Sequence, residues 1–263
     1  MTTPTFVDAP AISVVVPARD EVVAIGPLVD GIARALTNRA FEVIVVDDGS
    51  MDGTHHALAA LESRHHFLTT IRNDASRGQS TAVRQGVRLA RGAVVVTLDG
   101  DGQNPPDQIP LLLAPFEAPG MDSLGLVQGE RGDRRDSIAK RWASQGANSI
   151  RRALLRDGVR DSGCGMKAFR RGAYLDLPWF DHIHRFMPAM MLRKGWDVMT
   201  VSVTHRERIG GSSKYSNLAR ALAGIPDLLG AAWLIRRSGG RSGRLLEETP
   251  AAAVSAPQVK VHP

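Results

Sequence analysis

Two aspartates separated by one residue follow a short apolar stretch near the middle of the chain. Residues 94–98 are rich in β-branched side chains, which is typical of a buried strand, and Asp99 and Asp101 come directly at its end. Two carboxylates in such a place favour a bound cation, and oxygen ligands from Asp99, Asp101 and Gln103 suit Mg²⁺ or Mn²⁺ rather than zinc. The alternative is an acidic turn between a strand and a helix, since Asp-x-Asp alone is a weak signal.

The elements around this pair alternate between strand and helix. We expect strands over residues 12–16, 41–46, 67–71 and 94–98, and helices over residues 24–38 and 54–64 and from 77–80 to 91. This alternation predicts a doubly wound α/β sheet with right-handed crossovers. In such sheets ligands bind outside the carboxyl ends of the strands.

Three of the predicted strands end in polar loops, at residues 19–21, 47–49 and 99–103. Neither G-x-G-x-x-G nor G-x-x-x-x-G-K-[ST] follows the first strand, so a phosphate group has no all-glycine loop to bind it. The charge of a diphosphate would instead be met by a metal ion at Asp99 and Asp101. Asp48 is then expected to accept a hydrogen bond from a ribose hydroxyl or a base N–H group.

Composition and charge limit the partners of the chain. Its 263 residues are 43% hydrophobic and 23% charged, as in ordinary soluble globular proteins. A net charge of +6 favours anionic partners, but nucleic acid is not expected, because aromatic residues make up only 5% and no nucleic-acid motif is present. The single cysteine, Cys164, excludes an internal disulfide, fits a reducing cytosol and is expected to be a packed thiol. Neither a signal peptide nor a transmembrane run of about 18 apolar residues is expected.

Three ordered motifs carry a family resemblance. VVPARDE at 15–21, VVDDGSMDGT at 45–54 and LDGDGQNPP at 98–106 resemble the signatures of family 2, GT-A fold glycosyltransferases. Within that family the chain is most similar, from about residue 12 to residue 237, to the polyprenyl-phosphate sugar synthases, the group of dolichol-phosphate mannose synthase. The resemblance implies the GT-A fold: a doubly wound, mixed and mainly parallel sheet with helices on both faces, followed by C-terminal amphipathic helices.

The resemblance also implies roles for residues at the strand ends. Nucleotide-binding residues would be Pro17, Ala18, Arg19, Glu21, Asp47, Asp48, Gly78, Asp99 and Lys214. Asp101 and Arg208 would be catalytic, with Arg208 and Lys214 on a mobile basic loop that closes over the diphosphate. Relatives commonly have an aromatic residue at the position of Ala18 or Arg19, so the choice between UDP and GDP stays open.

The acceptor is implied by a second set of residues. The strand expected before residue 128 leads to Arg131, and Lys140 and Ser144 are spaced to share one helix face; in the family such residues bind a lipid phosphate. Arg206 is a further candidate for this phosphate, while Lys140 stands where the family often has arginine, which would replace a bidentate contact by a point charge. A solvated basic helix face is the alternative. Residues 161–171 resemble the stretch that lines the sugar pocket.

The remaining segments bear on domain organisation. We expect a flexible N-terminus at 1–10, a GT-A catalytic domain at 11–215, an amphipathic segment at 216–237 and a disordered tail at 238–263. The segment at 218–235 is apolar but carries Arg220, Pro226 and Asp227, which suits the plane of a membrane interface rather than a span. The methionine-rich stretch at 184–192 is open to two interpretations, core packing or a helix lying on a membrane. A late strand is expected at 201–205.

These observations predict an inverting glycosyltransferase. It would move a sugar from a UDP- or GDP-linked donor to a polyprenyl monophosphate with the help of Mg²⁺ or Mn²⁺, at the cytoplasmic face of a membrane to which it, or a membrane-anchored partner protein, is attached. One alternative is a family 2 transferase with a saccharide hydroxyl as acceptor, for which Asp161 is the only visible candidate for a catalytic carboxylate. The other is a non-catalytic protein that binds nucleotide sugars and recruits a membrane partner.

Overall fold

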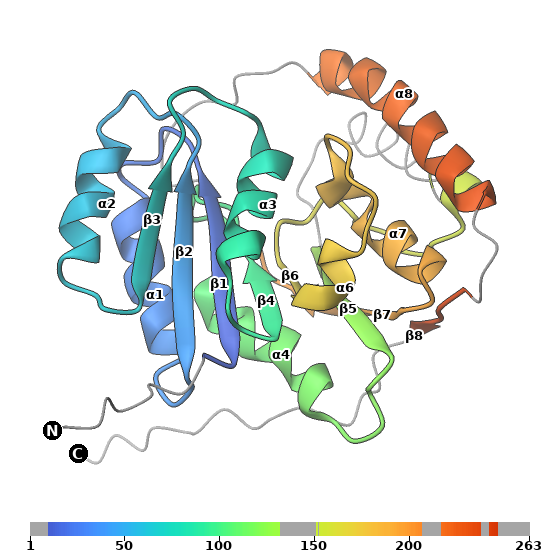
Figure 1. Ribbon diagram of the computed structural model, residues 1–263, viewed down its shortest axis with the longest axis horizontal. Helices are drawn as coiled ribbons and strands as arrows, with labels where there is room; N and C mark the ends of the chain where they lie inside the picture. The colour runs from blue at the N-terminus through green and yellow to red at the C-terminus, as the bar shows by residue number, and fades with distance from the viewer. Residues whose placement is uncertain (1–9, 132–150, 152, 207–216, 238–241, 247–263) are drawn as a thin grey trace, which may run out of the picture.

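One eight-stranded sheet organises the chain in the computed structural model, which describes residues 10–131, 151, 153–206, 217–237 and 242–246. Its order is β3-β2-β1-β4-β6-β5-β7-β8 (Figure 1). The strands are β1 (Ile12–Ala18), β2 (Phe41–Asp47), β3 (Leu68–Arg72), β4 (Val94–Thr97), β5 (Leu124–Arg131), β6 (Lys167–Arg170), β7 (Asp197–Val203) and β8 (Leu245–Leu246). Among these strands only β6 runs antiparallel to its neighbours, so the predicted mixed, mainly parallel sheet is confirmed.

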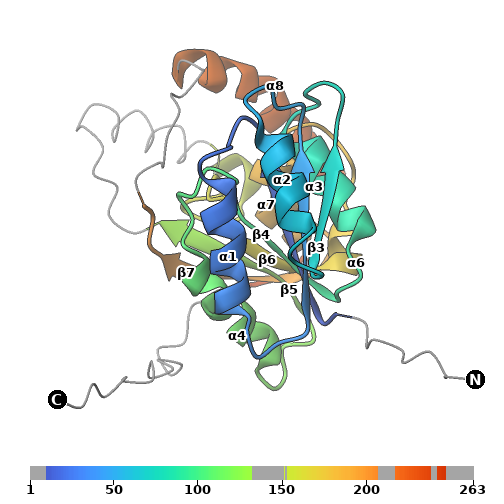
Figure 2. The same cartoon turned by 90° about the vertical axis from the view of Figure 1, so that its left-hand side faces the viewer.

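Helices cover both faces of this sheet. They are α1 (Ile25–Ala35), α2 (Thr54–Glu62), α3 (Gln79–Leu89), α4 (Ile109–Glu117), α6 (Arg171–Leu175), α7 (Met187–Arg193) and α8 (Asn217–Arg236), with short 3₁₀ turns η1 (Pro106–Gln108) and η2 (Ile183–Arg185). Viewed from the β3 edge, α1 and α4 lie on one side and α3 and α6 on the other (Figure 2). One hydrophobic core lies under α1, α2 and α4, and the second lies under α3, α6, α7 and α8.

The central strands are apolar on both faces because both faces are covered. Val14, Val15 and Val16 of β1 are fully buried, as are Val43, Val45 and their neighbours in β2. This is the pattern expected of a parallel sheet between two helical layers. Because β4 and β5 both pair antiparallel with β6, β5 runs in the same direction as β1, β2 and β4. The carboxyl ends of these four strands therefore meet at one edge of the sheet.

Two strand boundaries differ from the sequence prediction. Gln128 to Arg131 form the end of β5 instead of following it, because their backbone pairs in parallel with residues 200–203 of β7. The last long strand, β7, begins at Asp197 rather than at residue 201. Its first residue is a buried carboxylate that accepts from Ser123 Oγ (2.7 Å) and Arg244 Nη2 (3.0 Å), a pairing that the local pattern does not reveal.

The methionine-rich stretch packs into the core, so the first of its two interpretations is confirmed. Every residue from Met187 to Leu192 of α7 is buried, and most belong to the core under α3, α6 and α8. Part of the predicted disordered tail is also ordered: residues 242–246 include β8, which pairs with β7. This correction has a physical cause, because Arg244 binds Asp197 and Gly243 N donates to Leu192 O at 2.8 Å.

Helix α8 lies outside the sheet and is attached by its inner face to the core and to the segment that holds η2 and α7. Ala231 and Ala232 are buried against the core, Arg193 Nε donates to Leu234 O (2.9 Å), and His182 Nδ1 lies 2.8 Å from Asp227 Oδ2. Within the described part of the chain, the length and hydropathy needed to cross a bilayer are not found in any helix.

Candidate active site

The edge where the parallel strands end brings together the described residues that the sequence singled out. The end of β1 carries Pro17, Ala18 and Arg19, with Glu21 in the loop that follows, and the end of β2 carries Asp47 and Asp48. Gly78 directly precedes α3, and the loop after β4 carries Asp99, Asp101 and Gln103. Arg131 ends β5, and Arg206 follows β7. Four predicted residues, Lys140, Ser144, Arg208 and Lys214, lie outside the described residues. Strand order thus gathers segments up to 189 positions apart, from Pro17 to Arg206.

The first two motifs form one interlocked wall. Asp20, in a left-handed conformation with φ 57°, accepts from Met51 N (2.9 Å), and its own N–H donates to Ser50 Oγ (2.9 Å). The N–H of Glu21 donates to Thr54 Oγ1 at 2.9 Å. The wall therefore needs both motifs together, which explains why the polar residues recur in each.

Asp48 holds the loop that leads into α3. Its carboxylate accepts from Asn73 Nδ2 (2.9 Å), Ser76 Oγ (2.7 Å), and the N–H groups of Arg77 (2.8 Å) and Gly78 (2.9 Å). Burial opposes ionisation, yet these hydrogen bonds hold the pKa of Asp48 below its usual value. In this structure the carboxylate organises the loop; contact with a ribose or base stays a prediction.

Replacing Asp48 by asparagine should therefore destabilise the protein. We expect a loss of about 2–3 kcal/mol at pH 7, because at least one N–H donor of the loop would then face an amide N–H. The folded-state pKa is lowered, so the stabilisation is present above the unfolded pKa and is lost as pH falls. Urea unfolding of both proteins should show a difference that shrinks from pH 5 to pH 3; a constant difference would contradict the assignment.

Asp47 offers an acceptor that receives no hydrogen bond from the described residues. Its Oδ1 accepts from Ser50 N at 2.9 Å, while the buried Oδ2 has no hydrogen-bond partner among the described residues and lies 3.8 Å from Arg72 Nε. Such a buried acceptor is costly unless a donor reaches it. A base or sugar N–H or O–H group arriving at the end of β2 would supply that donor.

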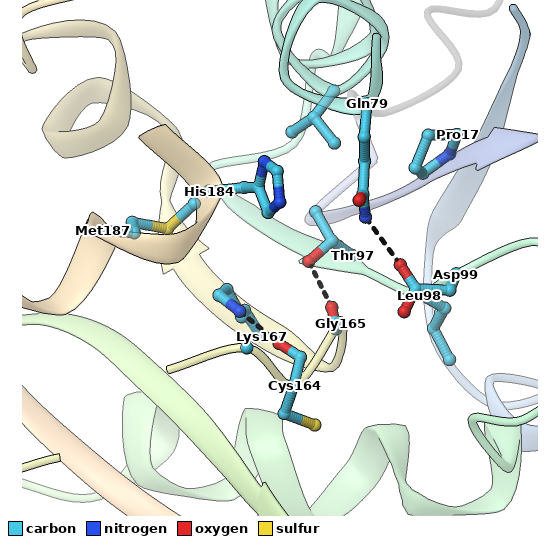
Figure 3. Close-up of a pocket in the computed structure, with 12 residues that line it drawn as sticks. Pro17, Gln79, Thr97, Leu98, Asp99, Cys164, Gly165, Lys167, His184 and Met187 are labelled. Atoms are coloured by element: carbon cyan, nitrogen blue, oxygen red, sulfur yellow. Dashed lines mark hydrogen bonds between the residues drawn. The ribbon is translucent and has the colours of Figure 1, made fainter. Parts of the chain in front are cut away.

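Asp99 and Asp101 form an acidic pair at the end of β4. Gln79 Nε2 donates to Asp99 Oδ1 (2.8 Å, Figure 3), and Gln103 N donates to Asp101 Oδ1 (3.1 Å). Burial and the charge of Asp101 raise the pKa of Asp99, and the positive charges of Lys167 and Arg131 oppose that rise. A cation bound at this strand end would offset the burial and repulsion that act on the Asp99 carboxylate.

The donor set fits a hard divalent ion that is shared with a substrate. Among the described residues, no group of three or more His, Cys, Asp or Glu side chains lies close enough to hold a metal ion by itself. Mg²⁺, however, is commonly bound through one or two carboxylates and completes its shell with substrate phosphates and water. Asp99, Asp101 and the Gln103 amide oxygen could supply such a partial shell.

Arg206 lies beside this acidic loop. Its N–H donates to Gln103 O (2.9 Å), Gln103 Nε2 lies 3.4 Å from Arg206 O, and its guanidinium is 3.6 Å from Asp107 Oδ2. The segment after β7 is therefore joined by its backbone to the proposed metal loop. This places the exposed Arg206 cation beside the loop that carries the acidic pair, and its contact with an acceptor phosphate stays a prediction.

Arg131 is also at the site edge, but a carboxylate partner accompanies it. Its Nε and Nη2 donate to Asp161 Oδ2 (2.6 Å) and Oδ1 (2.9 Å) in a bidentate pair. A cavity of about 290 Å³ opens beside the pair, lined in part by Arg160, Thr200 and Ser202. The pairing spans thirty positions and could not be inferred from sequence.

Sequence reasoning missed three polar side chains at the centre of the site. Gln79 binds Asp99, and the buried Lys167 donates to the carbonyls of Ser162 and Cys164. Both side chains, together with His184, line a second, smaller cavity beside Asp99 (Figure 3). Only Lys167 carried a signal, as part of the stretch at 161–171. Cys164 is buried, and burial raises the pKa of its thiol, which confirms a packed thiol rather than a nucleophile.

Comparison with known proteins identifies the family of this site. The model described as Glycosyl transferase family 2 matches residues 13–177, which span the acidic pair and all three motifs. The chain belongs to glycosyl transferase family 2. A crystal structure of glucosyl-3-phosphoglycerate synthase from Mycobacterium tuberculosis, in complex with Mn²⁺, UDP and glucosyl-3-phosphoglycerate, shares the fold of this family 2 chain with a TM-score of 0.61 at 20% identity, over 88% of this chain and 80% of that one.

Relatives of known activity are similar over most of this family 2 chain. Undecaprenyl-phosphate 4-deoxy-4-formamido-L-arabinose transferase of Pectobacterium carotovorum subsp. carotovorum is 33% identical over 215 residues, which are 80% of this chain and 64% of that protein. Dodecaprenyl-phosphate galacturonate synthase of Rhizobium johnstonii is 31% identical over 231 residues, 86% of this chain and 67% of that protein. The chain thus spans about two thirds of the length of these relatives.

Proposed function

We propose that this protein is an inverting glycosyltransferase that moves a sugar from a nucleoside diphosphate donor to a polyprenyl monophosphate. The observation that carries the proposal is the meeting of an acidic pair, Asp99 and Asp101, with the cations Arg131 and Arg206 at one edge of a family 2 fold. Two of the relatives, the undecaprenyl-phosphate 4-deoxy-4-formamido-L-arabinose transferase and the dodecaprenyl-phosphate galacturonate synthase, support the lipid acceptor.

The chemistry requires that two anions be brought together. Cleavage of the anomeric C–O bond leaves negative charge on the diphosphate, and Arg208 and Lys214 would stabilise that charge as it develops. A Mg²⁺ or Mn²⁺ ion held by Asp99, Asp101 and Gln103 would supply Lewis-acid stabilisation of the same group. Attack from the face opposite the leaving group inverts the anomeric centre.

The acceptor supplies its own nucleophile. A phosphate monoester has a second pKa of about 6, so at neutral pH it is largely a dianion and needs no general base. Arg131, Lys140 and Ser144 would hold it in line with the anomeric carbon. A saccharide hydroxyl, in contrast, needs a carboxylate base, and the candidate Asp161 has both oxygens engaged by Arg131.

The site must reach a lipid, and α8 offers a surface for this. Ile225, Leu229 and Trp233 recur at intervals of four and are 51%, 59% and 58% exposed, on the side away from the buried Ala231. Arg237 stacks on Trp233 with its guanidinium carbon 5.6 Å from the ring centroid. An apolar stripe next to arginine suits the interface of an anionic membrane, so we propose peripheral attachment at the cytoplasmic face through this stripe.

Serine at both Leu229 and Trp233 should weaken membrane binding. We expect at least about a 10-fold lower partition onto vesicles of phosphatidylglycerol and phosphatidylethanolamine, because two large apolar side chains would no longer leave water. Leu89→Ser on α3 is the matched control, since Leu89 is 56% exposed but lies on another element. Sedimentation with vesicles measures the effect; equal loss in variant and control would refute the role of α8.

A donor and acceptor screen tests the function as a whole. Purified protein with Mn²⁺ would receive UDP-glucose, UDP-galactose, UDP-galacturonate or GDP-mannose, together with a short polyprenyl phosphate or free sugars as acceptors. Sugar label that enters the organic phase supports the proposal, and label on free sugars supports the saccharide acceptor instead. If calorimetry gives the same nucleotide affinity with and without Mn²⁺, and no turnover is detected, the result would point to the non-catalytic alternative.

A further inference from the structure

A small cavity lies directly behind Asp99. Its volume is about 20 Å³, and its walls come from β1, α3, β4, the segment before β6, η2 and α7 (Figure 3). A space of this size holds a single water-sized group. It is too small for a sugar ring but large enough for one hydroxyl group that projects from a ring.

The cavity lies where a donor sugar has to be. Asp99 is one of its walls and also one of the two carboxylates proposed to hold the ion that binds the diphosphate. The sugar is bonded to the second phosphate of the donor, so in the proposed reaction it lies next to this carboxylate. A group of the sugar that points away from the acceptor side would enter the cavity.

His184 projects into this cavity with one nitrogen fixed. Its Nδ1 lies 2.7 Å from Ser80 Oγ, and Ser80 is buried in the first turn of α3. Among the described residues, Ser80 is the only one that the structure joins to this ring by a hydrogen bond, and the ring lies against the space that His184 lines (Figure 3). The ring is thus oriented by the protein and presents a single polar atom.

The other polar side chains of the cavity are already engaged. Gln79 donates to Asp99 Oδ1, Thr97 Oγ1 donates to Gly165 O (2.9 Å), and Lys167 donates to two loop carbonyls (Figure 3). His184 is therefore the described side chain best placed to take a new partner here. Its chemistry also suits a hydroxyl group, which both donates and accepts a hydrogen bond.

The imidazole is neutral at physiological pH. Burial and then the nearby positive charge of Lys167 hold the pKa of His184 well below its usual value. In the neutral ring, Nε2 carries a proton or a lone pair according to the tautomer, and the Ser80 hydroxyl rotates to complement either one. The neutral His184 ring can form a hydrogen bond with a sugar hydroxyl group without attracting a second anion into the site.

We propose that His184, oriented by Ser80, is a specificity-determining residue that hydrogen-bonds one hydroxyl group of the donor sugar. The inference rests on the proposed function, because it assigns the sugar contact within the same site.

A cycle of enzyme variants and deoxy donors tests the contact. The donor that supports transfer in the screen above is compared with its monodeoxy analogues, each lacking one hydroxyl. For the wild type, one analogue should lose about 10- to 100-fold in kcat/KM, because the buried imidazole loses its partner. His184→Ala should lose a similar factor with the parent donor and show almost no further loss with that one analogue.

Controls separate the contact from a structural role. Ser80→Ala should give a smaller loss confined to the same hydroxyl, and His56→Ala, at an exposed histidine of α2, should change nothing. Calorimetric binding of UDP or GDP, which lack the sugar, should stay within about twofold in His184→Ala. Equal losses of His184→Ala with every analogue, in an active wild type, would overturn the inference alone. Absence of transfer by the wild type with every donor would overturn the proposed function and the inference with it.

Discussion

Replacement of Asp101 by alanine should abolish glycosyl transfer, with kcat/KM lower by about 1000-fold or more. The carboxylate is proposed to hold the ion that neutralises the leaving diphosphate, a contribution of several kcal/mol in the transition state. Folding should be spared, because the hydrogen bond that Asp101 accepts comes from Gln103 N within the same loop. Removing one of two neighbouring carboxylates also relieves the repulsion that raises the pKa of Asp99.

The measurement combines turnover with nucleotide binding. In the wild type, Mn²⁺ should strengthen calorimetric binding of the donor nucleotide; in Asp101→Ala, binding with and without Mn²⁺ should be equal. Asp122→Ala is the matched control, since Asp122 is exposed in the loop before β5 and lies outside the site. Turnover of Asp101→Ala at the wild-type rate, with unfolding unchanged, would show that the ion is held elsewhere.

The sequence motifs predicted the part of the candidate site that lies in loops directly after the parallel strands. Asp48 and Asp99 each follow a short apolar run, and such runs form buried strands when helices cover both faces. Since parallel strands end at one edge, the strand alternation was enough to bring these loops together. The first, second and fourth strands begin where the pattern placed them, at Ile12, Phe41 and Val94.

Long-range pairing explains what the sequence did not reveal. His184 and Ser80 are 104 positions apart, and nothing near either residue signals a contact. The same holds for the Arg131–Asp161 pair and for Arg244, which binds Asp197 and so orders five residues of an expected tail. Each contact depends on the path of the antiparallel strand β6 or of the edge strand β8. Neither strand carries the long apolar run that marks β1 and β2.

A single added methyl group at Gly165 should disable the site while leaving the fold almost unchanged. A Cβ at this position would overlap the carboxylate of Asp99, and the three nearest atoms to it all belong to that carboxylate. The flexible end of one side chain can turn away at little cost, so we expect a shift in Tm of no more than a few degrees. The carboxylate would then no longer face Gln79 and Asp101. A displacement of about 1 Å at a reacting centre costs about 100-fold in rate, and we expect at least this loss for Gly165→Ala.

The control for this change is another glycine with open space. Gly172 lies in α6, where a Cβ would meet no atom within 4 Å, so Gly172→Ala should keep full activity and gain slightly in stability. The two variants add the same methyl group and differ only in what it touches. If Gly165→Ala binds nucleotide with undiminished dependence on Mn²⁺ and turns over normally, Asp99 is not a ligand that has to face the ion. Loss of Mn²⁺-dependent binding in Gly165→Ala, with Gly172→Ala unaffected, would instead tie the function to the orientation of one carboxylate, independently of any change in charge.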